Sequence, residues 1–539
     1  MGLGPGTLAQ EDTQLVEFGA LCAALGASSV GGPLSAAESA LLPGGECAFP
    51  DTERVREHIL SGADPLGDRI ITARSASDRR IIGQVFTPAT LVNEMVAWVL
   101  AQHPDRVVDC GCGSGRFALA AARANPQSRV LAVDLDPVST LACRANAAVL
   151  GLHNVRVHNE DFVRLPLSPV AGLTAFIGNP PYVRHHHIPA DLKAWARSKA
   201  NELGWSRWSG LSGLHAIFFM AVVSKSAPGD VGCLLTSSEW LDVNYGRAMR
   251  DALLNGAGGR SVHILHPEAR AFDDAMVTAS IMCFQRGHEA SSIRLQAART
   301  PDDLHDIERK GRPVSRSRLE AAVSWTELLA PGKRAPEGFL VLGDYIRVSR
   351  GAVTGANDFF LLPGTSAQRL GLAKYCIPAI TRAREVLGAN GRIESSQASR
   401  HLLAVSRDDI DTSKPLADYI NGRGLEVRDG YVCRSRTPWY SVPLKRPPIV
   451  ATYMGRGRPA FALNPDRLPI VNVVHGLYPK VELDDDQLVG LVNFLNSSDC
   501  LGSSGRTYQG GLRKYEPGEM ERMLVPPPDM LRDWTRLDS

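Results

Sequence analysis

Residues 107–115 read Val-Val-Asp-Cys-Gly-Cys-Gly-Ser-Gly. The first three residues are typical of a short buried strand, and Arg116 to Ala124 has the pattern of a helix. A strand, a glycine turn and a helix in this order open the folds that bind nucleotide cofactors. The glycines follow a G-x-G-x-G spacing, whereas dinucleotide sites favour G-x-G-x-x-G, and no Gly-Lys-Ser/Thr follows to hold a triphosphate. The sequence therefore favours a cofactor without phosphate groups.

A second apolar strand, residues 130–133, ends in an acidic residue, Asp134. The carboxylate follows the glycine turn by roughly the twenty residues at which an acid meets ribose hydroxyls in such folds. S-adenosylmethionine has those hydroxyls and lacks a pyrophosphate, so it is the predicted cofactor. Its predicted ligands in this part of the chain are Asp109, Gly111, Gly113 and Asp134.

A third unit places an acid and an aromatic residue after the apolar residues 155–157. These are Asp161 and Phe162, and they suit the amino group and the ring face of the cofactor's adenine. Each of these residues alone is more often structural than functional. The ordered series of strands ending in such residues favours a cofactor site.

The tetrapeptide Asn179-Pro180-Pro181-Tyr182 follows another apolar run, residues 175–178. An Asn side-chain carbonyl beside a Pro main-chain carbonyl offers two acceptors, which can take both N–H bonds of a planar amine and free its lone pair for attack. The prolines have no N–H and a fixed φ, and Tyr182 offers a ring for stacking. A Pro-Pro turn after a strand is the plain alternative. With the glycine turn upstream, the pattern predicts methylation of an NH2 nitrogen, with Asn179 also near the cofactor.

Before the glycine turn lies the segment Phe86-Thr87-Pro88. Thr followed by Pro is a helix-start signal, which predicts Thr87 as the N-cap and Pro88 as the first helical residue. Periodic apolar residues between Leu91 and Val99 fit the helix that would follow. An ordinary capped helix is the alternative to a functional role.

Taken in order, these motifs resemble the gamma-class DNA adenine-N6 methyltransferases of restriction–modification systems. The resemblance covers roughly residues 80 to 290 and includes Ser237-Ser238-Glu239-Trp240-Leu241, which matches a Ser/Thr-x-x-Trp-Leu-like element of the family. The chain departs from the family in its glycine turn, where Asp-Cys-Gly-Cys-Gly replaces the usual acid-Pro-x-x-Gly. The acid and the glycines are nevertheless present.

The resemblance implies an α/β fold, a doubly wound and mostly parallel Rossmann-like methyltransferase sheet with a C-terminal α+β target-recognition domain. It also implies that Phe86 and Thr87 close over the methionine part of S-adenosylmethionine, and that the target adenine is flipped out of the duplex. Tyr182 and Phe272 would then stack on opposite faces of the flipped base. Methyl transfer would be direct, with Asn179, Pro180 and Pro181 forming the amine pocket, and no metal would be needed.

The composition of the chain says less about its function than these motifs do. The chain has 539 residues, which suggests about three units, and its net charge of +2 gives only weak support for nucleic-acid binding. No Cys-x-x-Cys pair occurs, the longest apolar stretch, Ala216 to Val223, is too short to span a bilayer, and the N-terminus lacks a basic start followed by an apolar core. We therefore expect a cytoplasmic protein without a membrane partner. The consecutive His185, His186 and His187 lack the spacing of metal ligands, so we expect no metal there.

Local charge is more informative in the C-terminal part. Residues 431–465 contain no acid, and basic residues alternate there with aromatic ones. The predicted DNA-binding residues are Arg434, Arg436, Arg456 and Arg458. The alternative is a set of basic surface loops with the aromatic residues, among them Trp439, Tyr440, Tyr453 and Phe461, packed in a core.

The predicted organisation has four parts. They are an N-terminal accessory segment (1–75), a methyltransferase domain (76–295), a linker rich in charge and broken by prolines (296–335), and the target-recognition domain (336–539). The apolar residues 471–474 and 488–495 are expected in the core of the last part.

Two other classes of function stay open. Asn-Pro-Pro-Tyr also occurs in enzymes that methylate a protein glutamine amide, and RNA adenine methyltransferases use related pockets. A non-catalytic DNA-binding subunit of a defence complex is the other alternative, although every required side chain is present. The expected partners are duplex DNA and a cognate restriction endonuclease or other defence-system subunits, since no nuclease signature stands out in the N-terminal segment.

Overall fold

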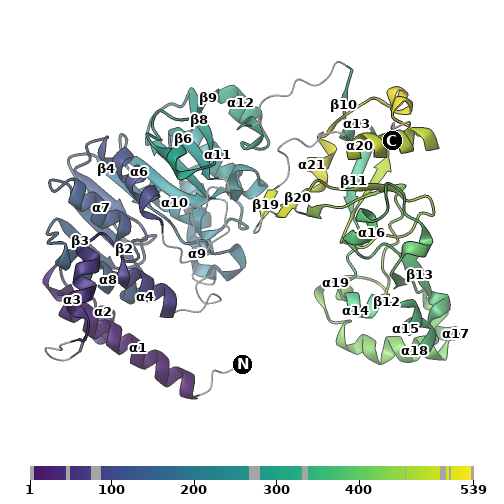
Figure 1. The fold of residues 1–539 in the computed structure, drawn as a ribbon, viewed down its shortest axis with the longest axis horizontal. Helices are drawn as coiled ribbons and strands as arrows, with labels where there is room; N and C mark the ends of the chain where they lie inside the picture. Colours follow the sequence, from purple (N-terminus) through teal and green to yellow (C-terminus); the bar gives the residue numbers. More distant parts are fainter. Residues whose placement is uncertain are drawn as a thin grey trace. The chain divides into compact units, whose positions relative to one another are not determined.

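The fold comes from a computed structural model, which describes residues 5–43, 49–73, 87–265, 279–329, 338–455, 457–497, 506–508 and 512–535. Only the backbone is described for residues 5–14, 301–302, 506–508 and 512. The chain divides into two compact units, Met1–Leu329 and Ala330–Ser539 (Figure 1).

A nine-stranded sheet forms the centre of the first unit, in the order β3-β2-β1-β4-β5-β7-β6-β8-β9. Its strands are β1 (Arg106–Asp109), β2 (Arg129–Asp134), β3 (Val155–Asn159), β4 (Thr174–Gly178), β5 (Val231–Ser237), β6 (Gly259–Leu265), β7 (Ala279–Gln285), β8 (Ser292–Ala298) and β9 (Arg312–Ser315). The five strands from β3 to β5 run parallel. The strands predicted at 107–109, 130–133, 155–157 and 175–178 are all present.

Helices cover both faces of this sheet (Figure 1). The helices of the unit are α1 (Pro5–Ala24), α2 (Ala36–Leu41), α3 (Thr52–Leu60), α4 (Pro65–Ala73), α6 (Ala89–Leu100), α7 (Arg116–Ala124), α8 (Pro137–Val149), α9 (Ala190–Glu202), α10 (Leu214–Lys225), α11 (Arg247–Leu254) and α12 (Arg316–Ala321). The predicted helix over 116–124 has these bounds. This arrangement confirms the predicted doubly wound, mostly parallel sheet.

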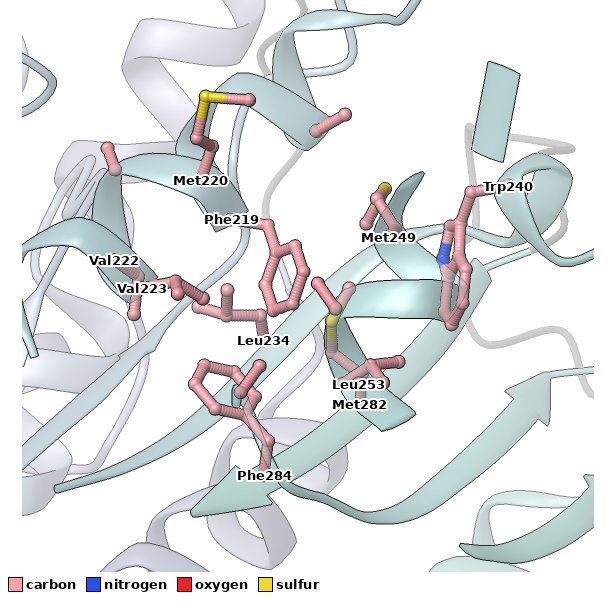
Figure 2. Close-up of a cluster of buried hydrophobic side chains, with 14 of the residues drawn as sticks. Phe219, Met220, Val222, Val223, Leu234, Trp240, Met249, Leu253, Met282 and Phe284 are labelled. Atoms are coloured by element: carbon pink, nitrogen blue, oxygen red, sulfur yellow. The ribbon is translucent and has the colours of Figure 1, made fainter. Parts of the chain in front are cut away.

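The central parallel strands β4 and β5 are buried on both faces because both faces of the sheet are covered. Successive residues of β1 point to opposite sides, so Val107 packs with α6 and α7 while Val108 packs in the core under α10 and α11. Figure 2 shows the second of these cores, where Phe219 of α10 lies against Phe284 of β7. The two rings meet edge to face with centroids 5.4 Å apart.

The strand order reverses beside β1, which pairs with β2 on one side and with β4 on the other. Such a switch point opens a crevice at the carboxyl ends of the strands, where α/β proteins bind their ligands. In the β1–β4 pair, Asp109 lies opposite Ile177. The glycine turn and the Asn-Pro-Pro-Tyr turn therefore leave the sheet side by side.

The predicted linker over 296–335 is wrong in its first part. Residues 292–298 and 312–315 form β8 and β9, which pair with each other and extend the sheet beyond β6. Trp325 is buried against Trp240, and Ser324 donates a hydrogen bond of 2.6 Å to Asp242. These contacts tie the segment up to residue 329 to the methyltransferase unit, because β8, β9 and α12 all pack on its edge.

The N-terminal segment is likewise part of the first unit rather than an appendage. Helix α8 is buried along most of its length because its outer face packs against the N-terminal helices. Its Arg144 is fully buried and pairs with Glu38 at 2.8 Å, and it also donates to the carbonyl oxygens of Val30, Gly32, Pro33 and Val157. A further bridge joins Gly31 to Arg156 at the β3 edge of the sheet.

The second unit is a mixed α+β domain, as predicted, and its described residues form four small sheets. Its strands are β10 (Leu340–Val341), β11 (Ile346–Arg350), β12 (Leu361–Leu362), β13 (Cys376–Ala379), β14 (Arg400–Leu403), β15 (Ile449–Ala451), β16 (Met454–Gly455), β17 (Phe461–Leu463), β18 (His475–Pro479), β19 (Arg506–Tyr508), β20 (Leu512–Lys514) and β21 (Leu524–Val525). Its helices are α13 (Leu342–Tyr345), α14 (Asn357–Phe360), α15 (Gly364–Arg369), α16 (Ala383–Leu387), α17 (Arg407–Thr412), α18 (Lys414–Asn421), α19 (Tyr431–Arg434), α20 (Asp485–Ser497) and α21 (Pro517–Glu521).

Its largest sheet has the order β11-β18-β15-β17, and α20 packs on it. Leu491 and Leu495 of α20 and the loop residues Val471 and Val474 are buried, which confirms their predicted place in the core. Among the described helices of the whole chain, none has the length and apolarity to cross a bilayer.

Candidate active site

The glycine turn after β1 and the tetrapeptide after β4 lie in direct contact. A β-carbon placed on Gly111 would lie 3.9 Å from the main-chain oxygen of Asn179. The approach is tighter at Gly178, with φ of +149°, where an added β-carbon would be 3.2 Å from Oδ1 of Asp109. The Asn-Pro-Pro-Tyr side therefore needs a small residue at position 178, and the predicted amine pocket borders the predicted cofactor turn.

Asn179 is also held by the segment that precedes α6. Its amide nitrogen donates a hydrogen bond of 3.2 Å to the hydroxyl of Thr87, which is only 4% exposed. The prediction that Thr87 caps the helix is wrong, because α6 begins at Ala89 with Pro88 as its N-cap and the Thr87 hydroxyl bonds Asn179 instead. Since the amide nitrogen faces Thr87, the amide oxygen of Asn179 faces away from Thr87.

Asp109 is a buried residue beneath the turn. Its Oδ2 accepts a hydrogen bond of 3.0 Å from the main-chain N–H of Ala118 in the first turn of α7. Burial raises its pKa to about 7, the negative charge of Asp134 adds to the shift, and main-chain N–H groups oppose it. The side chain is fully buried, so any effect on a cofactor acts through the turn that it shapes.

Asp134 and the glycines define the shape of the turn. The carboxylate accepts the N–H of Gly113 at 2.8 Å and that of Asp136 at 3.0 Å. Gly113 has φ of +53° and Gly115 has φ of +98°, and a β-carbon on Gly115 would lie 2.7 Å from the sulfur of Cys143. Position 115 therefore needs a residue that adopts a positive φ and has no β-carbon, and only glycine does both.

The next residue, Leu135, is 72% exposed although it is a large apolar side chain. It follows the acidic strand end directly and presents an apolar surface there. Sequence reasoning missed it, and its only signal was its position after Asp134. A glycine turn with open space at Gly111, the Asp134 carboxylate and an exposed apolar side chain together fit S-adenosylmethionine.

Asp161 and Phe162 differ in their surroundings. The Asp161 side chain is one-third exposed (33%) and accepts the N–H of Val163 at 2.9 Å. Phe162 is only 3% exposed, because its ring stacks on Phe218 of α10 with centroids 5.7 Å apart, and the ammonium of Lys225 lies 5.6 Å from its centroid. The expectation that Phe162 offers an open ring face is wrong, since the ring belongs to the core beneath α10.

Tyr182 is partly exposed, yet its hydroxyl is buried and has no hydrogen-bond partner among the described residues. Burial raises the pKa of this phenol, so the side chain stays neutral. Pro180 is buried and Pro181 partly so, and Val183 accepts the N–H of Leu214 at 3.0 Å, which fastens the turn to α10. Phe86 and Phe272 lie outside the described residues.

Comparison with known proteins identifies the family. Residues 332–539 match the family model for the type II methyltransferase M.Eco57I, C-terminal domain, and residues 107–198 match a methyltransferase domain model. The chain is 40% identical to the type II methyltransferase M.XamI of Xanthomonas campestris pv. amaranthicola over 472 residues, which are 86% of this chain and 87% of the relative. This chain belongs to the type II DNA methyltransferases of restriction–modification systems. The predicted use of S-adenosylmethionine is thereby confirmed.

Two further similarities of this type II methyltransferase are weaker, the first in the share of the chain that it covers and the second in sequence identity. A release factor glutamine methyltransferase of Moorella thermoacetica is 35% identical over 125 residues, which cover 21% of this chain and 42% of that protein. The solved structure of the type IIL restriction-modification enzyme MmeI in complex with DNA aligns with a TM-score of 0.52 at 13% identity, over 84% of this chain and 69% of that one. The second likeness shows a shared fold.

In the C-terminal domain of the methyltransferase, the predicted DNA-binding arginines divide into two kinds. Arg434 and Arg458 are exposed, whereas Arg436 donates to the carbonyl oxygens of Val353 and Thr354, the latter at 3.0 Å. Arg436 therefore holds a loop of its own domain. Arg456 lies outside the described residues.

The aromatic residues of the basic segment follow the alternative interpretation, in which they belong to a core. Tyr440 and Phe461 are buried. The ring of Trp439 packs against that of Phe359 with centroids 5.6 Å apart, and the ring of Tyr453 stacks on that of His475 with centroids 4.5 Å apart. Tyr440 and Phe461 are therefore not free to stack on DNA bases, whereas Trp439 and Tyr453 are partly buried against the same cores.

Proposed function

We propose that this chain methylates the exocyclic N6 nitrogen of adenine at specific sites in duplex DNA. The observation that carries the proposal is the placement of Asn179, whose main-chain oxygen borders Gly111 and whose side-chain amide is oriented by Thr87. We infer that this placement presents a carbonyl acceptor beside the cofactor turn, where a poorly nucleophilic amine needs one.

The amine would be held by two oxygens, the side-chain oxygen of Asn179 and the main-chain oxygen of Pro180. Each accepts one N–H bond and draws the nitrogen towards tetrahedral geometry, so the lone pair points out of the ring plane. S-adenosylmethionine, when bound, supplies an electrophilic methyl group. The nitrogen would form one bond to that methyl carbon as the carbon's bond to sulfur breaks, the electron pair of the broken bond would stay on the departing sulfur, and the nitrogen would lose one proton through Asn179 or water.

The target base must leave the duplex before its amino group can enter this pocket. Flipping costs roughly a few kcal/mol of unstacking and unpairing, and stacking in the enzyme offsets part of it. Tyr182 supports this step because the residue is partly exposed and its phenol stays neutral. Phe272 is proposed for the opposite face of the base.

Site choice would belong to the C-terminal domain. The exposed Arg434 and Arg458 can neutralise phosphates or contact guanine edges. Arg434 shares α19 with Tyr431, whose side chain is 82% exposed, and an exposed aromatic residue beside a cation suits a nucleic-acid surface. The comparison with M.Eco57I covers this domain, which supports its assignment to target recognition.

Methylation of a protein glutamine is the second candidate, because a glutamine methyltransferase shares part of the catalytic domain. The similarity covers only 21% of this chain, and it leaves the C-terminal domain without a counterpart. The DNA acceptor accounts for both units and is therefore preferred.

The direct test is expression in a host without DNA methylation, followed by sequencing of its DNA for modified bases. We expect N6-methyladenine at one short recognition sequence, and none with Asn179→Ala as the matched control. Modified cytosine instead of adenine, or modified RNA or protein with unmodified DNA, would contradict the proposal.

A further inference from the structure

The N-terminal helices reach the glycine turn through one carboxylate, Asp64. This residue directly precedes α4 and is 14% exposed in its side chain. Its Oδ2 accepts the hydroxyl of Ser114 at 2.5 Å and the Nε–H of Arg116 at 2.7 Å, and its Oδ1 accepts the amide of Asn146 at 3.3 Å. Both Ser114 and Arg116 flank Gly115, so the contacts fall on the turn itself.

The side chains of Asp64 and Ser114 lie so close to position 67 of α4 that this position requires a glycine. A β-carbon on Gly67 would lie 2.3 Å from Oδ2 of Asp64 and 2.9 Å from the Ser114 hydroxyl oxygen. The main-chain N–H of Gly67 donates to Oδ1 of Asp64 at 2.9 Å, which fixes the orientation of the carboxylate. The carboxylate is thus held from its own helix and presented to the turn.

Arg116 connects Asp64 to the amine pocket through further hydrogen bonds. Its Nη1 donates to the main-chain oxygen of Thr87 at 3.0 Å, and the hydroxyl of Thr87 accepts the amide of Asn179. A chain of hydrogen bonds therefore runs from Asp64 through Arg116 and Thr87 to Asn179. Its links are charge-assisted at the Asp64 end, where they are strongest.

Attachment of the N-terminal helices does not depend on this cluster alone. The buried pair of Arg144 and Glu38 anchors them separately at the β3 edge of the sheet. The Asp64 contacts are instead concentrated on the residues that border the cofactor turn, which is a place for positioning rather than for anchoring.

We propose that Asp64 is a positioning residue of the S-adenosylmethionine site, which makes the N-terminal segment part of that site. The inference rests on the proposed role of the Gly111–Gly115 turn in holding the cofactor. Asp64 fixes Ser114 and Arg116 so that the turn keeps its ligand-binding shape before the cofactor arrives. Without the carboxylate, part of the binding energy would be spent on ordering the turn.

The test compares Asp64→Asn with Asp68→Asn, measured by calorimetric titration of the purified full chain with S-adenosylmethionine. Asp68 is the matched control, because it lies on the same helix, faces Arg116 at 3.6 Å and is 69% exposed. We expect Asp64→Asn to raise the Kd by about tenfold, the effect of losing charge-assisted hydrogen bonds, and Asp68→Asn to change it by less than about twofold. The KM for the cofactor should rise with the Kd, while kcat at saturating cofactor falls less.

Glu38→Gln separates positioning from general stability. It breaks the other anchor of the same segment, so it should lower the unfolding temperature and leave the Kd for S-adenosylmethionine unchanged while the protein is folded. If Glu38→Gln weakens cofactor binding as much as Asp64→Asn does, Asp64 acts only through stability and the inference is overturned.

The inference also fails if folded Asp64→Asn binds S-adenosylmethionine with the wild-type Kd. Should that variant not fold, Ser114→Ala decides in its place: a Kd raised by about threefold supports the positioning role, and a wild-type Kd overturns it. Failure of the proposed function gives a different result, namely wild-type protein that binds the cofactor but leaves adenine in DNA unmodified.

Discussion

The side-chain amide of Asn179 donates a hydrogen bond of 3.2 Å to the hydroxyl of Thr87, across 92 residues of sequence. This bond decides which way the amide oxygen points. Thr87→Val keeps the size of the side chain and removes the acceptor, so the Asn179 amide loses its fixed orientation. We expect kcat for DNA methylation to fall by about tenfold or more, with a smaller change in the Kd for S-adenosylmethionine.

The control is Thr87→Ser, which keeps the hydroxyl and should retain most of the activity. Both variants are measured by transfer of a radiolabelled methyl group to a duplex that contains the recognition sequence. Equal kcat values for Thr87→Val and wild type would show that the bond does not orient the reacting group.

Asn179→Ala removes the proposed acceptor itself. Because the interaction strengthens chiefly in the transition state, we expect S-adenosylmethionine to bind within a few fold of wild type and kcat to drop by about 10²-fold to 10³-fold. Single-turnover methylation with calorimetric titration of the cofactor separates these two effects. A normal rate of methyl transfer would remove Asn179 from the mechanism.

The sequence predicted the parallel strands well because each contains a short apolar run, and β4 and β5 are buried on both faces. It failed at the edge of the sheet, where β9 buries only Val314 of its four residues and thus looked like a polar linker. One-sided burial at an edge leaves too few apolar residues to mark a strand.

The sequence named several residues of the two turns, but not the bonds that join them. Thr87 has a strong local preference to cap a helix, and only the fold brings Asn179 to its hydroxyl. The same holds for Asp64 and Ser114, which are 50 residues apart in sequence. Arg436 was assigned to DNA from its charge, whereas its position directs it to carbonyl groups of its own domain.

Tyr182 allows the ring and the hydroxyl to be tested separately. The hydroxyl is buried without a partner among the described residues, so Tyr182→Phe removes an unsatisfied polar group and should leave DNA methylation near wild type. Tyr182→Ala removes the ring and should weaken the extrahelical state of the base. Fluorescence of 2-aminopurine at the target position reports this state; an unchanged signal with Tyr182→Ala would mean that the ring does not hold the base.

Asp109 gives a prediction for the pH dependence of stability. Its pKa rises from an ordinary value of 3.8 to about 7 in the folded protein, mainly by burial. Between these two values the folded state binds more protons than the unfolded state, so this group makes stability fall as pH rises. We expect Asp109→Asn to remove a slope of up to about 1.4 kcal/mol per pH unit from about pH 4 to pH 7, measured by urea unfolding. Parallel curves for variant and wild type would contradict the assignment.

The arginines of the C-terminal domain should separate into binding and structural groups. Arg434→Ala and Arg458→Ala each remove an exposed cation, so the affinity for DNA should fall. The slope of log K against log salt should become shallower by about 1 for each phosphate that the variant no longer neutralises. Arg436→Ala removes donors to Val353 and Thr354, so it should lower the free energy of unfolding by about 1 to 3 kcal/mol. Fluorescence anisotropy with labelled duplex and denaturant unfolding measure the two effects. The division is wrong if Arg436→Ala keeps full stability and loses DNA binding with the same change in salt slope as Arg434→Ala.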